Sequence, residues 1–233
     1  MSKSGCLICG KDLTYFNSSQ KLKCSICGEM FETNAACKNE HFVCDKCHSQ
    51  PGILSVTVAA LTADSKNPIT IALGMMGGKS INMHGPEHHY LIAAALLSAY
   101  RNSGGDIDLE KALMTARQRS GNVPGGICGM WGACGAGIGA GIFISVITGA
   151  TPLSVEEWSQ ANTATSRSLN IIAQNGGPRC CKRNVWLSIM SAVDYTSEIT
   201  GVKMEKPEKI QCSFYPNNPT CKKRKCLYYP QAV

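Results

Sequence analysis

The first half of the chain beyond residue 50 alternates apolar segments with helix-start and helix-stop residues. Asn67-Pro68 predicts the start of a short helix, with Asn as the N-cap, and Gly77-Gly78 predicts its end. Pro86 opens a second, Ala- and Leu-rich helix over residues 87–101, which Gly104-Gly105 stops. Alternation typical of a strand is missing, apart from a candidate strand at residues 53–58.

The same pattern continues toward residue 201. Asp106 or Asp108 is expected to cap a third helix, and residues 134–148 predict a buried, Gly-rich helix. Ser154 and Glu157 have capping-box spacing before a helix that ends at Gly176-Gly177. Residues 181–200 predict the last helix. The expected fold is therefore mainly α, with an all-α core over residues 51–203.

Residues 1–50 have a different pattern, dominated by paired cysteines. Two Cys-x-x-Cys-Gly turns and a Cys-x3-His-x2-Cys-x2-Cys motif supply eight ligands, enough for two closed tetrahedral zinc sites. The eight are Cys6, Cys9, Cys24, Cys27, Cys37, His41, Cys44 and Cys47. We therefore predict a zinc-ribbon-like module with two structural zinc ions. Sequential pairing is favoured, in which Cys6/Cys9 join Cys24/Cys27; a cross-brace joining Cys6/Cys9 to Cys37/His41 is the alternative, and His48 is a spare ligand.

Composition and charge exclude several classes of protein. The chain has 233 residues, 14 cysteines, 44% hydrophobic residues and a net charge of +7, which excludes intrinsic disorder. The N-terminus lacks an apolar signal-peptide core, so we expect a reducing cytoplasmic location, where paired cysteines indicate metal or redox chemistry. Residues 120–155 carry no charge but are rich in Gly and too weakly apolar for a membrane span, so a buried core segment is expected.

The positive charge is concentrated in the C-terminal tail, residues 204–233. A basic run over residues 222–225 precedes two tyrosines, but such a run is more typical of a solvated tail than of a nucleic-acid site. The tail also carries Cys212, Cys221 and Cys226, which could hold a metal or an iron–sulfur cluster with a remote fourth ligand. Redox-labile thiols without a metal are the simpler alternative.

Candidate chemistry in the core gathers at three predicted helix starts, each preceded by glycines. A helix N-terminus favours a thiolate because of its free amides and partial positive charge. The candidate reactive residues are Cys134, Cys180, Cys181, His88 and His89, and the candidate cofactor-binding residues are Cys128, His84, Gly126 and Gly135. The alternative is structural: a buried thiol acts as a small apolar side chain, and the glycines only permit close helix packing.

The segments HGPEHH, GGICGMWGACGA and GGPRCCKR, together with the N-terminal Cys/His motif, resemble an uncharacterised family, domain of unknown function 5714, of archaea and anaerobic bacteria. Because some members are attached to methyltransferase domains, the resemblance implies a methyltransferase partner. A weaker resemblance links the core to redox-active, iron–sulfur-type proteins named for a C-GCAxxG-C-C pattern. It places the central motif at Cys134 and the later cysteines near Cys180 or Cys181, with His88 or His89 replacing the first cysteine.

The sequence thus predicts a cytoplasmic metal-binding protein with a buried Cys/His redox centre that handles electrons or sulfur. One rival is a non-catalytic adaptor whose zinc sites stabilise a docking surface. Another is an enzyme with a nucleophilic thiolate and His88 or His89 as its base. Dinucleotide, phosphate-loop and S-adenosylmethionine fingerprints are not found in the sequence.

Overall fold

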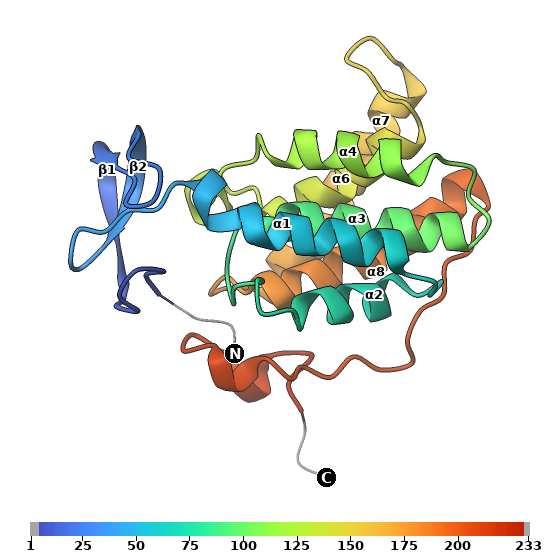
Figure 1. The fold of residues 1–233 in the computed structure, drawn as a ribbon. Coiled ribbons are helices and arrows are strands. Elements are labelled where there is room, and N and C mark those ends of the chain that lie inside the picture. Colours follow the sequence, from blue (N-terminus) through green and yellow to red (C-terminus); the bar gives the residue numbers. More distant parts are fainter. Residues whose placement is uncertain (1–4, 231–233) are drawn as a thin grey trace.

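A two-stranded antiparallel sheet forms the N-terminal part of the computed structural model, which describes residues 5–230 (Figure 1). Strand β1 (Leu13–Lys23) pairs with β2 (Met30–Cys37) so that Leu13 lies opposite Cys37 and Lys23 opposite Met30. The first four residues of the predicted module and the last three of the predicted tail lie outside the described residues. Among residues 5–230, strands are found only in this module.

Helix α1 (Asp45–Thr62) connects the module to the helical core without a break. It runs through the predicted boundary at residue 50, contains Pro51, and includes residues 53–58, so the strand expected there is wrong. The helix persists because its inner face is fixed by tertiary contacts. Val56 and Ala60 are fully buried, and Ser98 donates a hydrogen bond to the Ala60 carbonyl at 2.9 Å.

The centre of the core is α3 (Glu87–Asn102), which is buried on all sides from Glu87 to Tyr100. A helix that is apolar all round belongs in the middle of a bundle. Helices α1, α2 (Pro68–Met76), α4 (Leu109–Ser120), α6 (Gly135–Ile147) and α8 (Cys181–Thr200) all contact it (Figure 1). The mainly α fold class is therefore confirmed.

Most helix ends match the sequence signals, and two do not. The side chains of Asn67 and Asp108 cap α2 and α4 as expected. Helix α7 (Glu156–Asn175), by contrast, has no side-chain cap, because the Ser154 hydroxyl accepts from the Thr151 amide instead. The short helix α5 (Ile127–Met130), which contains Cys128, is not among the predicted helices.

The uncharged segment of residues 120–155 supplies α5 and α6, and α6 packs against α3, α7 and α8. Among the helices of residues 5–230, none combines the length and the apolar character that crossing a membrane requires. Most of α6 is buried, as predicted for a core segment, whereas the residues on either side are largely exposed, among them Trp131, Leu153 and Val155.

The C-terminal tail returns along the bundle toward the start of α8 (Figure 1). It contains two short 3-10 helices, η1 (Tyr215–Asn217) and η2 (Lys223–Lys225). Trp186 of α8 anchors it, with ring centroids 6.2 Å from Phe214 and 5.2 Å from Tyr228. This packing brings the tail cysteines to the N-terminal end of α8.

Candidate functional site

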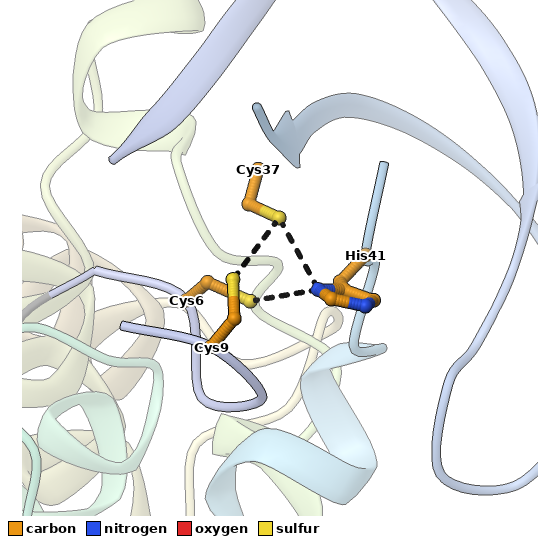
Figure 2. A group of neighbouring side chains, drawn as sticks. All are labelled: Cys6, Cys9, Cys37 and His41. Atoms are coloured by element: carbon orange, nitrogen blue, oxygen red, sulfur yellow. Dashed lines mark hydrogen bonds between the residues drawn. The ribbon is translucent and has the colours of Figure 1, made fainter. Parts of the chain in front are cut away.

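Two groups of four ligands in the N-terminal module could each hold a metal ion. The ligand atoms within each group all lie within 4.8 Å of one another. In the first, Cys9 Sγ lies 3.8 Å from Cys37 Sγ, and His41 Nδ1 lies 3.5 Å from Cys37 Sγ (Figure 2). Tetrahedral zinc with Zn–S bonds of about 2.3 Å places its sulfurs about 3.8 Å apart. The spacing therefore fits a closed tetrahedral site.

The pairing of the ligands is interleaved, so the sequential pairing favoured by the sequence is wrong. The groups are Cys6/Cys9/Cys37/His41 and Cys24/Cys27/Cys44/Cys47. The hairpin explains this arrangement, because it sets Cys37 opposite Leu13, just after the first cysteine pair. The amide of Ser25 in turn donates to the Phe42 carbonyl at 2.7 Å, which brings the second pair beside Cys44.

Backbone amides prepare two of these thiols for ligation. Burial alone would raise the pKa of Cys24, but the amides of Cys44 and Ile26, 3.4 and 3.5 Å from its Sγ, help to lower it to about 6. Burial likewise opposes ionisation of Cys37, and donors that include the Asn39 amide lower its pKa to about 7. Both residues favour the thiolate, the form that binds metal.

A cavity of about 580 Å³, the cleft, lies between this module and the helical core. The Asp45 carboxylate, at the start of α1, accepts a 2.6 Å hydrogen bond from the Gly125 amide and ties the two parts together beside it. Most of the predicted core site residues line the cleft, together with the spare ligand His48. They are Cys128, Cys134, Cys181, His84, His88, His89, Gly126 and Gly135.

Two adjacent histidines of the cleft are held in the same tautomer. His88 Nδ1 lies 3.0 Å from the Gly85 carbonyl, and His89 Nδ1 lies 3.1 Å from the Val123 carbonyl. A carbonyl only accepts, so each Nδ1 carries the proton and each Nε2 keeps a lone pair. Burial lowers the pKa of both rings, well below the ordinary range for His88, whose Nε2 is buried without a hydrogen-bond partner.

Burial favours the protonated form of two cleft thiols. Burial raises the pKa of Cys181 to about 12, and burial followed by the charge of Cys134 raises that of Cys128. Cys134, the N-cap residue of α6, accepts a hydrogen bond from the Asn184 amide nitrogen at 3.3 Å. The cleft thus presents thiols and neutral imidazoles from the N-terminal ends of α3, α5, α6 and α8.

Sequence reasoning missed two polar residues of the cleft, Arg179 and Asn184. The Arg179 guanidinium lies 5.7 Å from the ring centroid of Tyr15, so it faces the N-terminal module. Burial of His84, and then the positive charge of Arg179, lower the pKa of His84 to about 4. Arg179 directly precedes the paired cysteines in the sequence. A single arginine forms no motif, however, so its place in the cleft could not be predicted.

Four predicted cysteines lie elsewhere. Cys180 lines a second, smaller pocket together with the three tail cysteines, Cys212, Cys221 and Cys226. Cys180 and Cys181 therefore line different pockets, although they are adjacent in the chain. His84 connects the two regions, because its Nε2 lies 3.3 Å from Asn218 Oδ1, and Asn218 also lines the second pocket.

The glycine stripe of α6 serves helix packing. A Cβ atom at Gly137 would meet the Leu169 side chain of α7 at 2.7 Å, and one at Gly139 would meet the His89 carbonyl oxygen at 2.6 Å. A Cβ at Gly135 would collide with the His89 ring. These glycines therefore permit close helix packing, which was the alternative to cofactor binding. Gly135 also leaves room for the ring of His89.

A family model described as "Family of unknown function (DUF5714)" matches residues 56–229, about three quarters of the chain. The protein belongs to the DUF5714 family. The DUF5714 match begins inside α1, so the N-terminal metal module lies before it, and it includes the cleft's helix starts and the tail cysteines. Neither the curated proteins nor the solved structures contain a significant match.

Proposed function

We propose that the cleft holds a metal centre ligated by Cys134, Cys181 and one of the paired histidines, and that the protein performs redox or sulfur chemistry there. The observation that carries the proposal is the buried, unpartnered Nε2 of His88 in a cavity that also contains Cys134 and Cys181. The two N-terminal groups would hold structural zinc.

The side chains of the cleft fit a transition metal. Metal-binding histidines usually donate the other ring N–H to a carbonyl, as both His88 and His89 do. Thiolate and imidazole together suit zinc, iron and iron–sulfur centres. The high pKa of Cys181 fits as well, because a bound cation replaces the thiol proton and compensates the buried charge.

The spacing of the ligands distinguishes the cleft from the N-terminal module. Within residues 5–230, only the two N-terminal groups have three or more ligand atoms within 4.8 Å of one another. The cleft ligands are more widely spaced, around a cavity large enough for a small substrate. The three proposed protein ligands would leave the fourth position of a tetrahedral metal open, as in catalytic sites, whereas four ligands close a structural site.

The remaining residues would bind and orient the substrate. Arg179 supplies a positive charge that attracts an anionic group, and Asn184 fixes the Cys134 sulfur through its amide. The N-terminal module forms one side of the cleft, and the Asp45–Gly125 hydrogen bond holds it there. The methyltransferase partner and the cytoplasmic location remain predictions from the sequence.

Metal analysis of oxygen-free protein tests the proposal, with the adjacent cysteines as matched variants. Cys181→Ser should lower the metal content below wild type and change the spectrum of the centre, whereas Cys180→Ser should retain the cleft metal. A wild-type protein that contains only two zinc ions and no further metal would refute the proposal. So would a cleft metal that survives both Cys134→Ser and Cys181→Ser.

A second candidate is a metal-free nucleophilic thiol. It is favoured by Cys134, which lies at the N-terminus of α6 and accepts the Asn184 hydrogen bond. Alkylation rates of Cys134 in protein stripped of the cleft metal separate the two candidates. A rate far above that of a free thiol at pH 7 would favour the nucleophile, and a slow rate would favour the metal centre.

A further inference from the structure

The second pocket gathers four cysteines from two distant parts of the chain. Cys180 precedes α8, and Cys212, Cys221 and Cys226 belong to the tail. The tail is held against α8 by the aromatic contacts of Trp186 and by the Cys212 amide, which donates to the Tyr228 carbonyl at 2.8 Å. Folding of the tail onto α8 therefore creates a complete set of four thiols.

From this set we infer that Cys180, Cys212, Cys221 and Cys226 ligate an iron–sulfur cluster of the [4Fe–4S] type, at a site separate from the cleft. Four cysteine thiolates are the usual ligands of such a cluster. The sulfurs are not arranged as in a zinc site. No three of these four described sulfurs lie within 4.8 Å of one another, whereas both N-terminal groups meet that limit. A polynuclear core holds its thiolates further apart than a single ion does.

The surroundings suit a cluster with net negative charge. Lys182 and Arg183 are buried beside Cys180, and Lys222 also lines the pocket. Met83, Trp186, Tyr215 and Tyr229 supply apolar walls, which limit solvent access to the site.

Hydrogen-bond donors also point at the sulfurs. The Lys223 amide donates to Cys221 Sγ at 3.3 Å, and the Asn218 side-chain amide lies 3.8 Å from Cys180 Sγ. Burial raises the pKa of Cys180 and Cys212, and the neighbouring amides of Arg183 and Phe214 oppose that shift. Such donors stabilise ligated thiolates and tune a cluster's potential.

The pocket that the four cysteines line is small, about 20 Å³. Cluster binding must therefore move one side of the pocket outward. The tail is the side that can move, because it has two short 3-10 helices and no long element, whereas Cys180 is continuous with the 20-residue helix α8. A loaded cluster would then tie the tail to α8.

The test is anaerobic reconstitution of the full chain with ferrous iron and sulfide, followed by iron and sulfide analysis and electron paramagnetic resonance of the reduced protein. We expect Cys180→Ser and Cys221→Ser each to lose about four iron and four sulfide per chain relative to wild type. The adjacent control, Cys181→Ser, should keep this tail cluster. Circular dichroism of each variant shows whether the helical core is intact.

Three results would overturn the inference. One is full retention of iron and sulfide in both Cys180→Ser and Cys221→Ser. Another is zinc, or a single iron without sulfide, at the tail site of the reconstituted protein. The third is loss of the cluster in Cys181→Ser with retention in Cys180→Ser, which would place the cluster in the cleft and leave the proposed function standing.

Discussion

Cys180 and Cys181 are adjacent in the chain, yet their side chains line different cavities. Cys181 faces the cleft with Cys134 and the paired histidines, whereas Cys180 faces the tail cysteines. Asn218 lies between the two sites, 3.3 Å from His84 Nε2 and 3.8 Å from Cys180 Sγ. The start of α8 is therefore the point where the two candidate centres of this protein meet.

The interleaved pairing of the N-terminal ligands predicts how metal is lost from double variants. Cys6→Ser with Cys37→Ser disrupts one group, so the module should retain one metal ion. Cys6→Ser with Cys24→Ser disrupts both groups, so it should retain none. The number of metal ions bound per chain, measured for each double variant and for wild type, checks this prediction. Sequential pairing would give the reverse order, with both ions lost in the first double variant.

Close packing at Gly139 predicts a large effect of a single methyl group. In Gly139→Ala the new Cβ would meet the His89 carbonyl oxygen at 2.6 Å, so we expect a destabilisation of about 1–3 kcal/mol. Gly74, within α2, has no neighbouring atom within 4 Å of an added Cβ. Gly74→Ala should therefore be neutral or stabilising by up to about 1 kcal/mol. Urea denaturation of both variants checks the contrast, and equal stabilities would contradict it.

Burial of neutral His84 predicts that acid weakens the fold. Burial and then the charge of Arg179 lower its pKa from 6.5 to about 4, so the unfolded chain binds a proton more readily than the folded one. The contribution of neutral His84 to the free energy of unfolding is complete above about pH 6.5 and is lost as the pH falls toward 4. At pH 5 this amounts to about 2 kcal/mol at most, since each pKa unit corresponds to about 1.4 kcal/mol.

The variant His84→Gln isolates this contribution from those of the other buried histidines. Urea midpoints at pH 7 and pH 5, measured in the same metal state, should fall less for His84→Gln than for wild type. Equal falls would show that His84 is not the group responsible.

The sequence by itself determined most of the helices beyond residue 62, most of their caps and the chemical identity of the ligands. Asn67, Asp108 and the glycines after α3 and α8 act through backbone groups a few residues away, so their effects are readable locally. The eight N-terminal ligands were readable for the same reason, because Cys-x-x-Cys turns are short-range structures. Helix α1 was not predicted, since it continues through Pro51, whose local cost is outweighed by the burial of α1 against α3.

Only the tertiary structure decided which ligands share a site. The pairing of Cys6 with Cys37 depends on the register of a hairpin, and the separation of Cys180 from Cys181 depends on where the tail folds back. Arg179 entered the cleft in the same way, through packing against a module more than a hundred residues earlier in the chain. These contacts join distant segments, and their energy comes from burial and packing, which no spacing along the sequence encodes.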